Sequence, residues 1–338
     1  MRFCGIDLHS NNSVVVVSDE TDKVLLSRRC PNDLSKILTL LAPHRDELAG
    51  VVVESTYNWY WLVDGLMDHD YPVVLANPSA IDQYDGIKEA DDLTDAAFLA
   101  RLARLDILPT GYIYPREDRP VRDLLRRRTL LVQQRTALVQ SLQNMAMRQT
   151  GQHLGWRVLR DLSDEERTEL LGDHDCLRFV TTQQVALIEQ LQEKIKQFEA
   201  KVLEHAQLRP AYQYLLTIPG VGMILGLTIM LETGDIGRFA TVGDYTSYCR
   251  CVRATHTSNG KSKGKHNGKN GNPYLSWAFV EAVHHALRAC PEAKRFYDRK
   301  RTKRNGALAT KALAAKWSKA AYYMIKRQEA FDLTRVFG

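Results

Sequence analysis

The sequence lacks any apolar run long enough to span a bilayer, which takes about 20 residues. Its first residues, Met1 to Gly5, lead directly into a predicted strand and do not have the pattern of a signal peptide. We therefore expect a cytoplasmic protein without a membrane partner.

Cysteine is also scarce, with six residues in a chain of 338, and no two cysteines have the two-residue gap of a zinc knuckle or redox motif. Cys249 and Cys251 with His256 offer three potential zinc ligands, but no second ligand pair lies nearby in the sequence. We interpret the cysteines as reduced structural thiols.

The charge balance is only mildly basic. The chain has 46 Lys and Arg against 40 Asp and Glu, a formal net charge of +6, and the excess lies in the C-terminal third. The hydrophobic content of 44% supports packed cores, and the length is enough for two or three domains.

The first 112 residues read as an α/β domain. Strands are expected at residues 3–8, 13–18 and 23–29, then a helix near 34–41, and then strands at 51–54 and 72–76 with a helix at 60–67 between them. Three consecutive strands followed by alternating strands and helices is the order of an RNase H-like domain.

Four acidic residues lie in the apolar pattern of this domain: Asp7, Glu54, Asp92 and Asp95. A carboxylate at the end of a buried strand is costly unless a cation compensates it. Asp92 and Asp95, three positions apart, would project from one face of a helix. The quartet predicts a site for two Mg²⁺ ions, or Mn²⁺, about 3.5 to 4 Å apart, which suits phosphodiester chemistry. The alternative is that Asp92 or Asp95 only caps a helix, although Asp91 is the better placed cap.

Residues 113–207 are expected to form long charged helices. Ile188, Leu191, Ile195, Phe198 and Val202 recur at alternating gaps of three and four, which is typical of a coiled-coil seam. Leu131, Leu138, Leu142 and Met145 indicate a partner helix, and residues 151–176 are the expected connection. The seam could lie within one chain or between subunits.

Residues 208–338 begin with a turn that contains Gly220 and Gly222 and opens an apolar helix, as in a helix-hairpin-helix motif. Backbone N–H groups at such a helix start can hold a phosphate of a nucleic acid. The alternative is a Gly-rich turn with no ligand.

A loop rich in glycine, asparagine and lysine follows, with a composition suited to tracking a phosphate backbone. Its candidate nucleic-acid contacts are Lys261, Lys263, Lys265 and Lys269. A serine in this loop could be a nucleophile, but the chemistry alone does not choose Ser258 over Thr257 or Ser262. A second basic run supplies further candidate contacts: Arg299, Lys300, Arg301, Lys303 and Arg304.

In this order the motifs form a recognisable pattern. The chain resembles the DEDD serine transposases of bacterial insertion sequences, also called bridge-RNA-guided recombinases. The resemblance covers essentially the full length. It depends on Gly5-Ile6-Asp7-Leu8-His9, Glu54 to Trp61, Asn77-Pro78, Asp91 to Ala96, Ile218 to Gly222, and Ser258 to Lys261 before Gly271 to Leu275.

The resemblance implies a RuvC-like metal-binding domain (1–112), a helical coiled-coil region (113–207) and a transposase domain (208–338). Asp7, Glu54, Asp92 and Asp95 would be the acidic quartet, and Ser258 the nucleophile that links covalently to DNA. Donor and target DNA and a noncoding guide RNA would be the partners. The enzyme would work as a homo-oligomer, a dimer or tetramer in which the serine domain of one subunit completes the metal site of another, and it would associate with the nucleoid when bound to DNA.

Three other functions stay open. A related DNA invertase would use the same residues on differently arranged sites. A RuvC-like junction nuclease would use the acids and an activated water but not Ser258. A noncatalytic nucleic-acid scaffold would need neither.

Overall fold

The computed structural model describes residues 1–81, 92–172, 174–206, 208–252, 257–258, 261–262 and 270–338. They form two compact units, Met1–Ile113 and Tyr114–Gly338. The first unit is mixed α/β and the second is mostly helical, which confirms the predicted division into an α/β part and a helical part. The three-domain division at residues 112 and 207 stays a prediction. Among the described helices, none is long and apolar enough to cross a membrane.

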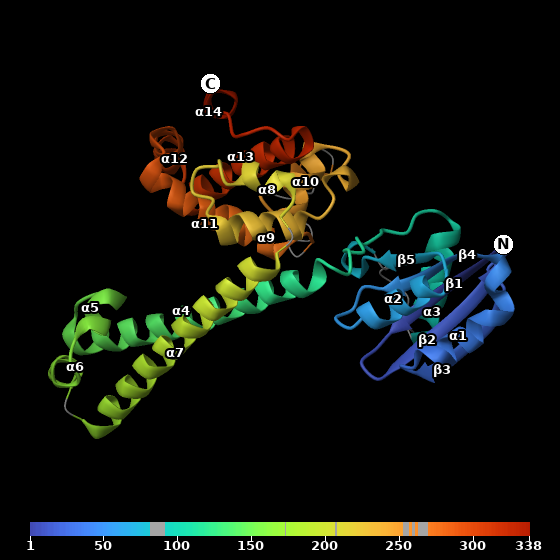
Figure 1. The fold of residues 1–338 in the computed structure, drawn as a ribbon, viewed down its shortest axis with the longest axis horizontal. Helices are drawn as coiled ribbons and strands as arrows, with labels where there is room; N and C mark the ends of the chain where they lie inside the picture. The colour runs from blue at the N-terminus through green and yellow to red at the C-terminus, as the bar shows by residue number, and fades with distance from the viewer. Residues whose placement is uncertain (82–91, 173, 207, 253–256, 259–260, 263–269) are drawn as a thin grey trace. The chain divides into compact units, whose positions relative to one another are not determined.

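A five-stranded mixed sheet is the frame of the first unit (Figure 1). The strands have the order β3-β2-β1-β4-β5. The pairs β3–β2 and β2–β1 are antiparallel, and the pairs β1–β4 and β4–β5 are parallel. Each predicted strand is present with small shifts at its ends: β1 Arg2–Leu8, β2 Asn12–Asp19, β3 Val24–Pro31, β4 Leu48–Glu54 and β5 Val73–Ala76.

Helices cover both faces of this sheet because both faces are apolar. The helices α1 (Leu34–Leu41) and α2 (Tyr60–Asp68) pack on the face that carries Ile6 and Val53. The helix α3 (Asp92–Arg104) packs on the opposite face, where Val14 and Val16 contact Ala96 and where Val52 contacts Leu99. Alternate residues of a strand point to opposite faces, so β1 serves both cores. Two short 3₁₀ helices complete the unit, Ala42–Glu47 and Pro78–Ala80.

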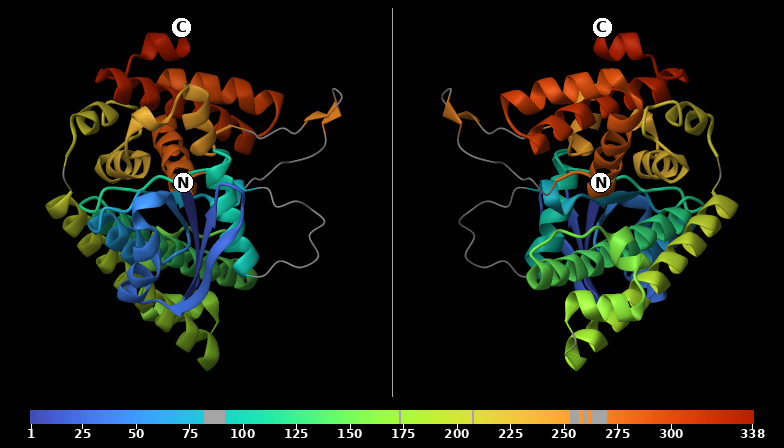
Figure 2. Two further views of the ribbon diagram at one scale, coloured as in Figure 1. Left: turned by 90° about the vertical axis from the view of Figure 1, so that its right-hand side faces the viewer. Right: turned by 90° about the vertical axis from the view of Figure 1, so that its left-hand side faces the viewer.

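The second unit contains two long helices, α4 (Arg119–Thr150) and α7 (Asp175–His205), which pack against each other (Figures 1 and 2). Of the predicted seam residues, Ile188, Ile195 and Val202 are buried. The segment expected as a connection contains two short helices, α5 (Trp156–Asp161) and α6 (Asp164–Leu171), whose leucines join α4 and α7 in one apolar cluster.

The remaining helices pack around Phe279 and Trp317, both fully buried. In chain order they are α8 Pro210–Leu215, α9 Met223–Thr233, the 3₁₀ helix Ile236–Arg238, α10 Val242–Tyr248, α11 Pro273–Ala289, α12 Pro291–Lys303, α13 Gly306–Arg327 and α14 Leu333–Phe337. Two short antiparallel strands, β6 (Thr257–Ser258) and β7 (Lys261–Ser262), lie between α10 and α11. All six cysteines are free thiols, and five of them are buried.

Candidate metal centre

Two of the predicted acids, Asp7 and Glu54, come from neighbouring parallel strands. Ile6 of β1 lies opposite Val53 of β4, so Asp7 and Glu54 are the next residues along the two strands. Both therefore lie toward the carboxyl ends of their strands and on one face of the sheet. Asp7 is 4% exposed, whereas Glu54 is half-buried.

The other two acids are brought to this face by the close packing of α3 on Gly5. A Cβ atom at Gly5 would lie 2.0 Å from the backbone oxygen of Ala96 and 2.9 Å from the backbone nitrogen of Ala100. Gly5 and Asp7 are two residues apart on a strand and so face the same helix. Asp92 and Asp95 are in the first turn of that helix. A carboxylate oxygen of Asp92 lies within 4.8 Å of one of Asp7, and Asp95 is near enough for its charge to act on Glu54.

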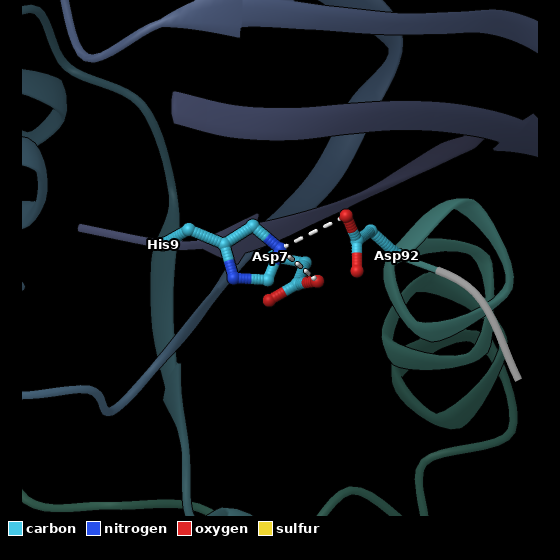
Figure 3. A group of neighbouring side chains, drawn as sticks. All are labelled: Asp7, His9 and Asp92. Carbon is cyan, nitrogen blue, oxygen red and sulfur yellow. Dashed lines mark ion pairs between the residues drawn. The ribbon is translucent and has the colours of Figure 1, made fainter. Parts of the chain in front are cut away.

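His9 joins the acids at the end of β1 (Figure 3). Its Nε2 atom lies 3.1 Å from Oδ2 of Asp7 and 3.3 Å from Oδ2 of Asp92. The exposed Arg29 of β3 contacts the same oxygen of Asp92, with its Nη2 atom 2.5 Å away. Arg29 is therefore the positive charge that balances Asp92 in this structure.

Glu54 has the clearest electrostatic perturbation of the cluster. Partial burial, a hydrogen bond with Asp7 and the negative charges of Asp7 and Asp95 raise the pKa of Glu54 to about 7. Converging carboxylates share protons in this way when no cation offsets their charge. The site therefore holds more negative charge than its protein surroundings compensate.

The residues present fit a divalent cation. Within the described residues, one ligand atom from each of Asp7, His9 and Asp92 lies within 4.8 Å of the others. Carboxylate oxygens are the ligands that Mg²⁺ prefers, and imidazole suits transition metals. From the sequence we name His9 only as part of the family motif, and we give neither His9 nor Arg29 a role in the site. The position of His9, two residues after Asp7 and so on the same side of an extended chain, was a usable signal, whereas nothing local links Arg29 to Asp92.

Ser258 lies in the second unit, and its backbone is described as part of the β6 and β7 ladder. Ser258 pairs with Lys261, and Thr257 pairs with Ser262. Lys263, Lys265 and Lys269 lie outside the described residues. Past this loop, Gly271 has a φ of +92° and Asn272 begins α11 by accepting hydrogen bonds from the N–H groups of Tyr274 and Leu275.

The two glycines of the predicted phosphate-binding turn have different surroundings. A Cβ atom at Gly220 would lie 2.1 Å from the backbone oxygen of Ala282 and 2.6 Å from the backbone nitrogen of Ala286, so Gly220 allows this turn to pack on α11. Gly222 is exposed, has no atom within 4 Å of an added Cβ, and precedes the first residue of α9. Gly220 thus has a packing reason that needs no ligand, while the helix start at Gly222 is open.

The predicted basic run occupies the end of α12 and the residue after it. All five side chains are exposed: Arg299, Lys300, Arg301, Lys303 and Arg304. Arg301 lies 3.6 Å from Asp298, the one ion pair recorded in the described structure for this run. Because these side chains are exposed, they are accessible to phosphates, whereas the arginines near the start of α4 are buried.

Two family models match consecutive parts of the chain. A model of a DEDD, IS110-type transposase, described as "Transposase", matches residues 4–150, and a model described as "Transposase IS116/IS110/IS902 family" matches residues 212–298. The first match contains all four acids, and the second contains Ser258.

Curated relatives are similar over nearly the whole chain. The mini-circle putative transposase for IS117 from Streptomyces coelicolor is 25% identical over 99% of this chain and 96% of its own length. The IS116 uncharacterized 44.8 kDa protein of Streptomyces clavuligerus is 23% identical over 92% and 90%. The transposase for insertion sequence element IS1111A of Coxiella burnetii is 23% identical over 98% and 91%.

These matches define the class of the protein as a transposase, an enzyme that cleaves and rejoins DNA. The chain belongs to the IS110/IS116/IS902 family of transposases.

Proposed function

We propose that this transposase excises and inserts its element with a RuvC-like metal site made by Asp7, Glu54, Asp92 and Asp95 and with Ser258 as the nucleophile. The observation that carries the metal part is the convergence of carboxylates from β1, β4 and α3 on one face of the sheet. The sheet order β3-β2-β1-β4-β5 supports the RuvC-like assignment.

The acids would hold the cations and fix the position of the DNA phosphate. Bound Mg²⁺, or Mn²⁺, would supply neutralisation of the charge that develops on the phosphate. In the serine step, the Ser258 oxygen forms a bond to phosphorus, the bond from phosphorus to the adjoining deoxyribose oxygen breaks, and the hydroxyl proton ends on that leaving oxygen. One phosphodiester bond replaces another, so the covalent protein–DNA bond keeps the phosphate activated for rejoining.

Replacement of Asp7 by asparagine tests the metal site through two effects of opposite sign. Without metal, Asp7→Asn removes a negative charge that raises the pKa of Glu54, so the unfolding temperature in chelator should stay equal or rise. The rise of that temperature on adding Mn²⁺ should be lost, because a ligand is missing and affinity falls tenfold or more, which is about 1.4 kcal/mol.

The matched control is Asp106→Asn. Asp106 is exposed with a φ of +54°, a conformation that asparagine tolerates. Its metal response should equal that of the wild type. If Asp7→Asn lowered the unfolding temperature in chelator and left the metal response intact, Asp7 would be a structural residue.

Covalent capture tests the serine. Wild-type protein is incubated with magnesium, DNA spanning the element ends and RNA from the noncoding flanks, and a denaturation-resistant protein–DNA adduct is expected. Ser258→Ala should give no adduct, whereas Ser262→Ala and Thr257→Val, in the same hairpin, should retain it. An equal adduct from Ser258→Ala would move the nucleophile to another residue.

Guidance by a noncoding RNA and action as a dimer or tetramer are parts of the proposal supported by the resemblance. The exposed basic run from Arg299 to Arg304, together with Lys261, Lys263, Lys265, Lys269, Gly220 and Gly222, is the proposed nucleic-acid surface. Binding through phosphates should weaken as salt rises.

The rival with a specific observation in its favour is the water-dependent nuclease, because the acidic cluster is complete without the second unit's serine. It predicts cleavage without an adduct, equal in wild type and Ser258→Ala. An invertase would give the adduct but would join different sites, which reaction products on paired sites distinguish.

A further inference from the structure

The Nε2 atom of the His9 imidazole lies among carboxylates. The Nε2 atom is buried, although the His9 side chain as a whole is 37% exposed, and within the described part of the chain this atom makes no hydrogen bond. Carboxylate oxygens of Asp7 and Asp92 nevertheless lie 3.1 and 3.3 Å from it. A ring that served only to neutralise these acids would point an N–H at one of them. Here the nitrogen is close to an oxygen of each acid (Figure 3). With neither oxygen does it have the geometry of a hydrogen bond.

The backbone of His9 is held in place by contacts that do not involve its ring. Its carbonyl oxygen accepts hydrogen bonds from Nδ2 of Asn32 and Nδ2 of Asn58, each at 3.0 Å. Its N–H donates to the carbonyl oxygen of Asn12, also at 3.0 Å. Asn32 precedes α1 and Asn58 precedes α2, so two segments fix the turn after β1. Because the backbone of His9 is already ordered, little conformational entropy of the backbone is lost when a cation binds.

The contact of Arg29 with Asp92 does not prevent binding of a cation. The Arg29 side chain is 54% exposed, and exposed ion pairs contribute little to stability. Arg29 can therefore leave the shared Asp92 oxygen at small cost when a divalent ion brings two positive charges to the same place.

We propose that His9 Nε2 is a ligand in the same centre as Asp7 and Asp92 and that it makes this centre prefer Mn²⁺ over Mg²⁺. This proposal rests on the proposed function, which places a divalent cation among the acids. Mg²⁺ favours oxygen ligands only, whereas imidazole nitrogen suits first-row transition metals. A quartet of carboxylates alone would have no nitrogen with which to make this distinction.

The test is pulsed electron paramagnetic resonance of Mn²⁺ bound to the full chain after removal of metals with chelator. A ¹⁴N coupling from directly bound imidazole is expected in the wild type, and labelling with ¹⁵N-histidine should replace it with a ¹⁵N coupling. His9→Asn, which offers an oxygen in place of the nitrogen, should lose the coupling and bind Mn²⁺ about tenfold more weakly. Its Mg²⁺ affinity should change less than about twofold.

The control is His153→Asn, an exposed histidine of the second unit, which should keep both the coupling and the affinities. Mn²⁺ binding without nitrogen coupling, or an equal loss of both ions in His9→Asn, would overturn the role of His9 and leave the acidic site standing. Absence of Mn²⁺ binding by the wild type would overturn the acidic metal site itself.

Discussion

Replacing Gly5 by alanine is expected to destabilise the unit of residues 1–113 by about 3 kcal/mol and to weaken Mn²⁺ binding at least tenfold. The added Cβ would lie 2.0 Å from the backbone oxygen of Ala96 and 2.9 Å from the backbone nitrogen of Ala100. Backbone atoms of a packed helix cannot turn away as a flexible side chain can, so α3 must shift off the sheet.

The shift of α3 would act on the proposed site because Asp92 and Asp95 are in its first turn, while Asp7 and Glu54 stay on the strands. Stability is to be followed by hydrogen exchange in β1 and α3, and metal affinity by calorimetry with Mn²⁺. Both quantities should fall together, since one displacement causes both.

Gly50→Ala is the matched control in the same sheet. Gly50 is in β4, and its added Cβ would have its nearest neighbour, the backbone oxygen of Pro72, at 4.0 Å, which is ordinary contact. This variant should bind Mn²⁺ like the wild type. Undiminished binding by Gly5→Ala would mean that the contact at Gly5 does not set the position of Asp92 and Asp95.

The strands of the first unit were predictable because their signal is local. The β-branched run from Val14 to Val17 and the apolar run from Val51 to Val53 each identify a buried strand within a few residues. The spacing of Asp92 and Asp95 likewise identifies a shared helix face. The local pattern does not reveal the close contact between Gly5 and Ala96, because that contact forms only when the helix packs on the sheet.

Residues 151–176 contained a local signal that our sequence reasoning did not use. Ser163 and Glu166 form a capping box, in which the serine side chain accepts from the N–H of Glu166 and the glutamate accepts from the N–H of Ser163. The spacing of serine and glutamate is the known signature of a helix start. The segment expected only as a connection therefore contains helix α6.

The buried charge network of the second unit was invisible in the sequence for a different reason. Glu232 in α9 is 1% exposed, and its partners lie on α4 and at the start of α11. Charged residues are almost never fully buried unless they are paired, and no short-range pattern reports a partner so distant in the chain. The sequence shows Glu232 only as the charged position of an otherwise mostly apolar helix.

Glu232 has hydrogen-bond donors for both carboxylate oxygens. Arg126 donates from Nε to Oε1 at 2.6 Å and from Nη2 to Oε2 at 2.9 Å. Arg122, itself buried, donates from Nε to Oε2 at 3.0 Å, and Nδ2 of Asn272 donates to the same oxygen at 2.7 Å. Asn272 also caps α11, directly after the segment that contains Ser258. The network thus fastens the end of that segment to α4 and α9.

Replacing Glu232 by alanine is expected to lower the free energy of unfolding of the second unit by about 3 to 5 kcal/mol, because Arg122 would stay buried without its counter-charge. Hydrogen exchange of α9 and of the first turn of α11 measures this loss where it occurs. The control is Glu199→Ala on α7. The Glu199 side chain, which pairs with Arg128, is 30% exposed, so its loss should lower the free energy of unfolding by no more than about 1 kcal/mol.

The dependence on pH separates the charge of Glu232 from its packing. Burial alone would raise the pKa of Glu232, but the hydrogen bond from Arg126 and the charges of Arg122 and Arg126 outweigh it and hold this pKa below its ordinary value of 4.5. A carboxyl with a depressed folded-state pKa contributes stability that is present above the unfolded-state pKa and is lost as the pH falls toward the folded-state value. The wild type should therefore lose stability below about pH 4.5 more steeply than Glu232→Gln, which cannot gain this proton. Parallel acid profiles for the two proteins would show that the ionised carboxylate is not what stabilises the network.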